Sequence, residues 1–228
     1  MQKKNSLEGA RRRPKRRIRR SAEVARKMII DAAVHQFALK GFEGARVDEV
    51  ARRSGVNKTL LYYHIGNKDK LFIAALEATY KTIRLRQKDS WIDEAKPEDG
   101  VRRLIRLLMS IWVDYPEIGR LLSNANFIGG QHIRRSKVIR RLYNPLLKTL
   151  NTLLANGARQ GIFRHGIDAV DLYISISALS AYYVSHHYSF DVLFHGNLMS
   201  PRRLRQRERH IMDMVFRYLL LKPGNYVD

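Results

Sequence analysis

The sequence predicts an all-α protein, with a small N-terminal domain of three helices that contains a helix-turn-helix and a larger C-terminal domain of longer helices. Apolar residues recur at spacings of three and four in every long segment, as they do on one face of a helix. No segment of useful length alternates apolar and polar residues, so no strand is expected. A compact block at residues 47–64 holds two short helical patterns separated by Ser54 and Gly55.

The first 20 residues are expected to form a disordered basic arm. They contain ten Lys and Arg residues against one Glu, and such a run repels itself and has nothing to bury. The arm is either a solvated tail without a role or a segment that seeks the phosphates or the minor groove of a nucleic acid.

The N-terminal domain is expected over residues 21–75. Ser21 is a suitable N-cap for its first helix, and Gly41 ends that helix. The block at residues 47–64 follows, and a longer helix starts near Lys68. The buried faces of the first and the last helix are marked by apolar residues, which are Val24, Met28, Ile29, Ala32, Ala33 and Phe37 in the first and Leu71, Phe72, Ala75, Leu76 and Tyr80 in the last.

The C-terminal domain is expected over residues 76–228. The polar stretch at residues 89–100 is interpreted as the inter-domain connection. A helix with one broad apolar face covers residues 101–115 and ends at Pro116. A short helix then runs to about Asn126.

The rest of this domain is predicted to hold three long helices after a pair of glycines at residues 129–130. The first covers residues 137–160 and should kink at Pro145. The second is strongly apolar, covers residues 168–190 and begins with an aspartate that can cap it. Pro201 opens the last helix.

The charge of the chain indicates a negatively charged partner. The 228 residues include 43 Lys and Arg against 21 Asp and Glu, a formal net charge of +22. Such an excess favours a polyanion, most often nucleic acid and less often an anionic membrane surface. Cysteine is absent, which excludes disulfides, thiolate metal sites and cysteine nucleophiles. We expect a soluble protein of a reducing compartment, because no apolar run could span a bilayer and no secretory signal follows the basic N-terminus.

The block at residues 47–64 has the features that a helix-turn-helix requires. Ala51 is the small residue where two helices cross closely, and Gly55 can end the first helix in a left-handed conformation. Asn57 can cap the second helix. The apolar wedge that fixes the angle between the helices is supplied by Val47, Val50, Val56 and Leu61, of which the last two are placed as a hydrophobic staple.

The motifs around this block resemble the DNA-binding domain of TetR-family transcriptional regulators, over about residues 21–75. The remainder is similar to the family only in its number and layout of helices. The turn Asp114-Tyr115-Pro116 and the helix that begins Asn57-Lys58-Thr59 are similar to the subgroup containing the pyrimidine-utilisation regulator. The motifs that carry the family resemblance are Gly41-Phe42, Val47-x-x-Val50-Ala51, Ser54-Gly55-Val56, Leu61-Tyr62-Tyr63-His64 and Asn67-Lys68-Asp69-Lys70-Leu71.

The sequence departs from the family pattern at two places. Ala45-Arg46 stands where the family has two threonines, so the usual hydroxyl cap and its bond to a phosphate are missing. Arg46 can replace the phosphate contact by its charge but cannot cap the helix. Thr59 stands where a Gly, Ala or Pro is usual and can add a contact to a base or a methyl group.

Helix geometry divides the residues of the second helix into a buried and a DNA-facing set. With Leu61 and Ile65 toward the core, Lys58 and Thr59 project toward the major groove, together with the tyrosines discussed next. Lys58 can donate to the O6 and N7 atoms of guanine. Thr59 and Leu60 can contact a thymine methyl group.

The remaining candidates are expected on the DNA backbone. Tyr62, Tyr63 and His64 are interpreted as contacts to phosphates or sugars, although either tyrosine could instead only pack against the protein. Lys68 begins the next helix, where its charge joins the free N–H groups of a helix N-terminus, a good seat for a phosphate. The alternative for Lys68 is a surface position without a role.

The resemblance implies a homodimer formed by the last two long helices, which pair across a two-fold axis in the family. Residues 172–188 are apolar nearly all round, which favours a helix covered on both sides, although a simple core is the alternative. A dimer is also required because one recognition helix reads too few base pairs for useful specificity.

A small-molecule effector pocket is expected between the middle helices of the C-terminal domain. Each candidate could instead be an ordinary core residue. Adjacent histidines at 186 and 187 point about 100° apart on a helix and cannot chelate together, so no metal site is expected. The candidate lining residues are Trp112, Tyr115, Phe127, Tyr143, Tyr173, Tyr182 and His186.

We interpret the sequence as a DNA-binding transcriptional regulator of the cytoplasm and its nucleoid, a repressor released from a palindromic operator by an effector. No paired carboxylates, Ser-His-Asp set or Gly-rich phosphate loop is present, so neither enzyme activity nor a cofactor is expected. One alternative is a nucleoid-type protein that binds DNA without sequence preference. A basic membrane-surface protein is a further alternative, which conflicts with the helix-turn-helix.

Overall fold

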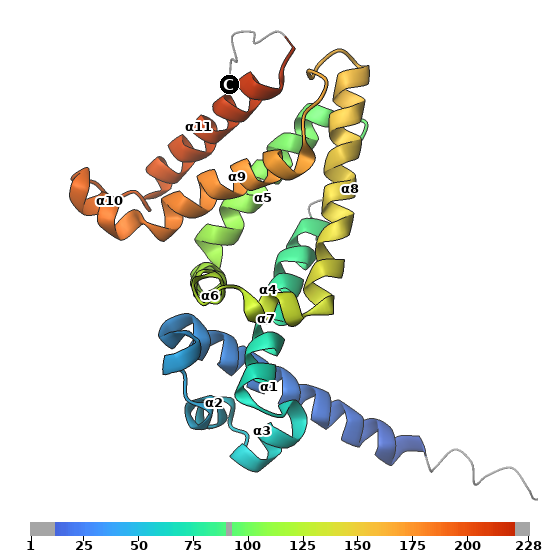
Figure 1. The fold of residues 1–228 in the computed structure, drawn as a ribbon, viewed down its shortest axis with the longest axis vertical. Helices are drawn as coiled ribbons and strands as arrows, with labels where there is room; N and C mark the ends of the chain where they lie inside the picture. The colour runs from blue at the N-terminus through green and yellow to red at the C-terminus, as the bar shows by residue number, and fades with distance from the viewer. Residues whose placement is uncertain (1–11, 90–92, 222–228) are drawn as a thin grey trace, which may run out of the picture.

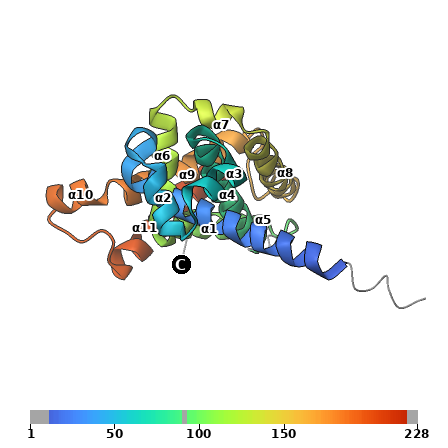
Figure 2. The same cartoon turned by 90° about the horizontal axis from the view of Figure 1, so that it is seen from below.

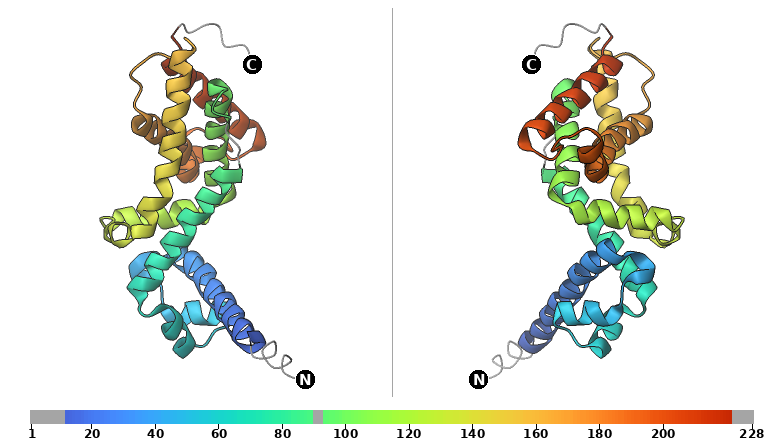
Figure 3. Two further views of the ribbon diagram at one scale, coloured as in Figure 1. Left: turned by 90° about the vertical axis from the view of Figure 1, so that its right-hand side faces the viewer. Right: turned by 90° about the vertical axis from the view of Figure 1, so that its left-hand side faces the viewer.

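The structure is a computed structural model that describes residues 12–89 and 93–221, and these residues form helices and short connections (Figure 1). Within those ranges the only β-type pairing is an isolated antiparallel bridge between Phe163 and Leu220. The all-α prediction is therefore confirmed. The molecule is elongated, with the first three helices at one end and α4 running from them into the second domain (Figure 3).

The N-terminal domain is built from α1 (Arg12–Gly44), α2 (Val47–Ser54), α3 (Lys58–Ile65) and the first half of α4 (Lys68–Asp89). Its core is centred on aromatic rings of α1 and α4. Phe37 and Phe72 are fully buried with their ring centroids 4.7 Å apart, and Ile29, Leu61 and Leu71 join the same apolar cluster.

Helix α1 corrects the expectation of a disordered arm. It begins at Arg12 rather than at the expected cap Ser21, so residues 12–20 continue the helix, whereas residues 1–11 lie outside the described part of the chain. Arginine has a high helix propensity, and a helix already fixed by packing extends at little cost. The N-terminal end of α1 projects beyond the helices that pack on it (Figure 2). As expected, Gly41 interrupts the helix, with a φ of 67°.

The C-terminal domain consists of seven further helices among the described residues. The polar connection before them is shorter than expected, because α5 already begins at Pro97. The predicted breaks at Pro116 and at residues 129–130 are confirmed, but a short helix, α7, was not foreseen. The helices are α5 (Pro97–Asp114), α6 (Pro116–Phe127), α7 (Gln131–Arg135), α8 (Lys137–Arg159), α9 (Ala169–Ser185), α10 (His187–Leu193) and α11 (Pro201–Leu219).

Helix α9 begins as predicted and ends earlier. Asp168 caps it, since its Oδ1 accepts hydrogen bonds from the N–H groups of Val170 and Asp171 at 2.7 and 2.9 Å. The helix was expected to reach about Phe190 but ends at Ser185, and α10 follows as a separate helix. The hydroxyl of Ser185 and the ring of His186 both lie within bonding distance of the carbonyl of Tyr182, and such local side-chain bonds compete with helix continuation.

The two domains share apolar contacts rather than meeting only through α4. Helix α4 runs without a break through residue 75, where the domain boundary was expected. Leu121 and Ala125 of α6 and Ile139 of α8 are buried in the same cluster as Phe37 and Phe72. A movement of α6 or α8 would therefore be felt in the core of the N-terminal domain.

Candidate nucleic-acid interface and ligand cleft

Helices α2 and α3 form the predicted helix-turn-helix at the end of the molecule farthest from α11 (Figure 3). Gly55 follows α2 in the left-handed conformation, with a φ of 68°, and the N–H of Val56 donates to the carbonyl of Ala51. Asn57 caps α3, since its Oδ1 accepts a hydrogen bond of 2.8 Å from the N–H of Leu60. These local interactions fix the angle at which α3 leaves the turn.

One side of α3 is buried and the other is open to solvent. Leu61 and Ile65 are buried against the domain core, as predicted from the helix period. The exposed side chains include Tyr63, which is 83% exposed and stands edge-on to the ring of His64 at 5.4 Å. The open side of α3 carries Lys58, Thr59, Leu60, Tyr62 and Tyr63, and His64 lies at its edge, half-buried.

Lys58 is held at the start of α3 by a carboxylate of α2. Its Nζ lies 2.6 Å from Oδ1 of Asp48, and both side chains are largely exposed. The hydrogen bond and the charge of Asp48 raise the pKa of Lys58 above its ordinary value. Lys58 is thus a full cation, placed at the first turn of the helix that would enter a major groove.

Arg46 precedes α2 in the position expected for it. Its backbone is extended, its side chain is exposed, and that side chain makes no capping hydrogen bond. Only its carbonyl takes part in the helix start, where it accepts from the N–H groups of Glu49 and Val50. As expected, Arg46 does not cap α2 through its side chain, and its role as a phosphate contact stays a prediction.

Lys68 at the start of α4 is anchored to the protein. Its Nζ donates to the carbonyl of Glu43 at 3.0 Å and lies 5.1 Å from the centre of the Phe42 ring. Asn67 caps the same helix through a bond of 2.9 Å from the N–H of Lys70. Lys68, which was expected to contact a phosphate, is therefore oriented by contacts within its own domain.

A cleft of about 740 Å³ lies where the end of α1 meets α5, α6 and the junction of α9 with α10. Its volume is in the range of small-molecule sites. Trp112 forms one wall and packs on α6 so closely that a Cβ atom at Gly119 would lie 2.8 Å from the ring. Two cations, Lys40 and Arg120, line the cleft, and in the described structure neither forms an ion pair with a carboxylate.

The cleft gathers only two of the seven predicted pocket residues, Trp112 and His186. Four of the other five lie elsewhere in the structure, because aromatic character alone does not separate core, surface and cavity positions. Tyr115 packs in a small separate cluster and contacts Arg86. Phe127 is 93% exposed. Of the others, Tyr173 packs against the main core, Tyr182 is exposed and stacked on His186, and the side chain of Tyr143 lies outside the described side chains.

Helices α9 and α11 carry apolar side chains that are about half exposed in the described chain. Ile174 is 55% exposed, and it shares one face of α9 with Val170 and Tyr182 at multiples of four residues. Met214 and Tyr218 form a similar stripe on α11. Apolar side chains that share an exposed helix face are typical of interaction surfaces.

Two further kinds of site are absent from the described residues. None of their helices is both long and apolar enough to cross a membrane. No three of their His, Asp or Glu side chains come together in a group that could hold a metal ion.

Comparisons with known proteins extend these observations. Residues 29–75 match the family model "Bacterial regulatory proteins, tetR family", and residues 97–215 match "Tetracyclin repressor-like, C-terminal domain". The chain is 28% identical to the HTH-type transcriptional repressor NicS of Pseudomonas putida, over 87% of this chain and 93% of NicS. It is 32% identical to the HTH-type transcriptional regulator RutR of Escherichia coli, over 45% of this chain and 48% of RutR.

A solved structure shows the same fold. The transcriptional regulator FadR from Bacillus subtilis, in complex with stearoyl-CoA, superposes with a TM-score of 0.60 at 18% identity. The match covers 84% of this chain and 98% of that one.

Proposed function

Because this chain belongs to the TetR family of bacterial regulatory proteins and is a DNA-binding transcriptional regulator, we propose that it is a homodimeric repressor. Two α3 helices read the half-sites of a palindromic operator, and a small-molecule effector releases the protein. The regulator therefore acts at the nucleoid, in the cytoplasm. The observation that carries the proposal is the open face of α3, on which Lys58 and Thr59 stand above the buried Leu61.

The residues of this face divide the work of reading and holding DNA. Lys58 and Thr59 lie at the first turn of α3, where a recognition helix approaches base edges. Arg46 and Lys68 lie before α2 and at the start of α4, where they would contact phosphates on either side of the groove. The exposed rings of Tyr62 and Tyr63 add contacts to sugars or phosphates.

The net charge of +22 favours a second candidate, a protein that binds DNA without regard to sequence. Selection of DNA from a random pool by the purified protein separates the two. We expect a two-fold symmetric sequence whose affinity exceeds that of random DNA by at least about a thousandfold at the same salt concentration. Enrichment of no sequence, with equal affinity for all DNA, would establish the second candidate instead.

We further propose that the effector binds in the cleft between α1, α5, α6 and α9. The cations of Lys40 and Arg120 and the wall of Trp112 suit an organic anion with a flat or apolar body. The cleft also lies against the N-terminal domain, since residues 38–41 of α1 line it. The side-chain amide of Asn124 on α6, also in the lining, donates to the carbonyl of Phe37 at 3.1 Å. An occupant that moves α6 would thus act directly on the end of α1.

Thermal unfolding with a panel of ligands tests the effector cleft. Aromatic and aliphatic carboxylates are expected to raise the melting temperature, by about 5–10 °C for a ligand present at a hundred times its Kd. Neutral amides of the same compounds should have much smaller effects. Arg120→Ala should reduce the shift given by the best carboxylate, whereas Arg134→Ala, on α7 outside the cleft, serves as the control. Equal shifts in melting temperature with both variants would show that the effector does not bind in this cleft.

A further inference from the structure

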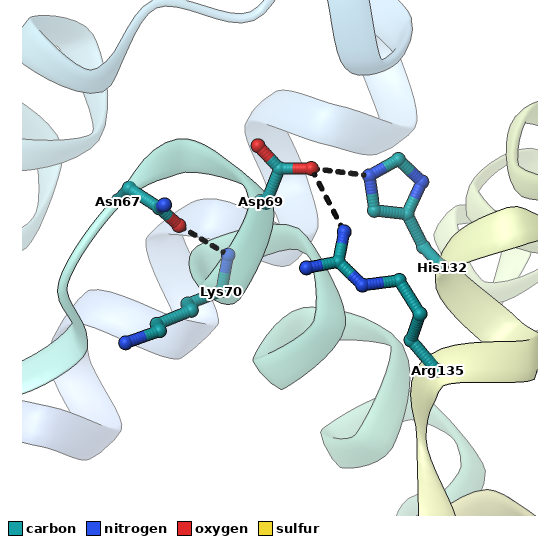
Figure 4. A network of polar contacts seen from close by, with 5 residues as sticks. All are labelled: Asn67, Asp69, Lys70, His132 and Arg135. Atoms are coloured by element: carbon teal, nitrogen blue, oxygen red, sulfur yellow. Dashed lines mark hydrogen bonds and ion pairs between the residues drawn. The ribbon is translucent and has the colours of Figure 1, made fainter.

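A polar contact joins the first turn of α4 to the short helix α7 (Figure 4). The Nε2 atom of His132 lies 3.1 Å from Oδ1 of Asp69, and a guanidinium nitrogen of Arg135 donates to the same oxygen at 3.2 Å. Asp69 belongs to the segment that matches the N-terminal family model, and the other two residues belong to the segment that matches the C-terminal model. The contact therefore crosses the domain boundary.

His132 is the buried member of this contact, which we name the α4–α7 latch (Asp69, His132 and Arg135). Its side chain is 1% exposed, and its ring packs against Phe42 and Phe72 with centroid distances of 4.6 and 4.9 Å. A polar ring enclosed by two phenylalanines is costly unless it is hydrogen-bonded. The hydrogen bond to Asp69 thus offsets the cost of burying the polar ring of His132.

The protonation state of the latch follows from its geometry. The hydrogen bond from His132, followed by that from Arg135, holds the pKa of Asp69 below its ordinary value, so the carboxylate is ionised at neutral pH. An ionised carboxylate only accepts, and Nε2 of His132 must therefore carry the donated proton. The other ring nitrogen, Nδ1, is buried without a hydrogen-bond partner, so it does not help to hold the ring in place.

The latch lies close to the DNA-reading face along the chain. Helix α3 ends at Ile65, and Gly66 and Asn67 form the turn before α4. Asp69 is the second residue of α4 and follows Lys68, the expected phosphate contact. A second bond supports the docking, since Ser136, directly after α7, donates to Glu77 of α4 at 2.6 Å. A shift of α7 would thus act on Asp69, which lies two residues after the turn that joins α3 to α4.

We propose that His132 and Arg135 are positioning residues for DNA binding, which fix the orientation of α3 relative to the dimerising domain by holding Asp69. The inference rests on the proposed reading of an operator by two α3 helices. In a dimer, the distance and angle between these helices decide which half-site spacing is bound. A held helix also loses less freedom on binding, so the latch favours one spacing and disfavours others.

The experiment measures spacing selectivity, which a merely structural contact would not set. The probes are the operator selected by the wild-type protein and the same DNA with one or two base pairs inserted at its centre. One base pair moves a half-site by about 3.4 Å and turns it by about 34°. The wild-type affinity should fall by at least about tenfold with one inserted base pair.

Asp69→Ala and His132→Leu should lower this affinity ratio at least about threefold, by weakening the original spacing more than the altered one. His132→Gln keeps a donor for Asp69 and should retain most of the ratio. Leucine at position 132 suits its aromatic neighbours, so His132→Leu should keep the melting temperature, which separates the loss of selectivity from unfolding.

Asp31→Ala is the matched control, because it removes the same charge from an ion pair with Lys27 that stays within α1. Its affinity ratio should equal that of the wild type. A wild-type ratio in both Asp69→Ala and His132→Leu would overturn the latch as a positioning device. Failure of the wild-type protein to select any sequence would instead contradict the proposed function, before the latch is tested.

Discussion

Replacing Lys58 with alanine is expected to weaken binding to the selected operator by about ten- to a hundredfold for each half-site. Binding to random DNA at the same salt concentration should change little. The lysine stands at the first turn of α3 with its ammonium group exposed, and a guanine edge in the major groove offers two acceptors to such a donor. Competition binding of the variant to operator and to random DNA measures the difference.

Lys58 must break its ion pair with Asp48 to reach a base, and this costs little free energy. Both partners are exposed, and exposed ion pairs contribute little net stability, so Lys58 can leave Asp48 for a base at small cost. The carboxylate that remains lies close to the DNA and would be repelled by phosphates. Asp48→Asn should therefore raise the affinity for random DNA and narrow the gap between operator and non-specific sites.

Lys68→Ala is the comparison that separates reading from holding. Lys68 is the first residue of α4 rather than part of α3, and its Nζ is held by the carbonyl of Glu43. This variant should weaken operator and random DNA by similar factors and lower the salt dependence by roughly one unit per half-site. Equal losses on both kinds of DNA in Lys58→Ala would make Lys58 a phosphate contact and leave base reading to Thr59, Leu60 and Tyr63.

Features set by residues close in sequence were predicted from the sequence. Gly55 ends α2 and Asn57 caps α3, because a left-handed turn and a capping oxygen need only a few neighbouring residues. The exposure of the α3 face followed from the helix period once Leu61 and Ile65 were assigned to the core.

The helix bounds predicted from the sequence were wrong where opposing local effects are close in magnitude. Charge repulsion predicted disorder before Ser21, but the helix propensity of arginine, added to a helix fixed by packing from Ile29 onward, extends α1 to Arg12. Apolar character predicted a helix through Phe190, whereas hydrogen bonds of Ser185 and His186 to a single carbonyl interrupt it.

The cleft and the latch depend on contacts between distant segments, which no local pattern encodes. Asp69 lies within a motif that marked the family resemblance, yet its partner is 63 residues away. The sequence does not distinguish Lys40 and Arg120 from the many other cations of this basic chain. Gly119 is the one local signal that could have been used, because a glycine inside a helical pattern often indicates the close approach of a large side chain, here Trp112.

The largest effect is expected from a charge placed on the face through which the dimer is proposed to form. Ile174 on α9 is 55% exposed, and Met214 on α11 is 44% exposed. A two-fold axis repeats any substitution on both copies. Ile174→Asp would therefore place two carboxylates in the interface, each of which costs several kcal/mol when it is buried without a partner.

That cost compares directly with the free energy of association. A dimer with a micromolar dissociation constant is held by about 8 kcal/mol, so two buried carboxylates should convert Ile174→Asp into a monomer at micromolar concentration. Sedimentation of the wild-type and variant proteins measures this change. The fold of each copy should be retained, because the position is open to solvent in the single chain.

Operator affinity should fall by at least about a hundredfold in the same variant, because a monomer loses the second half-site and the effective concentration that linkage gives it. Leu85→Asp, a substitution with the same charge change at an exposed leucine of α4, should remain dimeric and bind the operator almost normally. If Ile174→Asp sediments as a dimer, α9 is not in the interface. The exposed apolar side chains of α10, Val192 and Leu193, would then be the next surface to test, because α10 follows directly after α9.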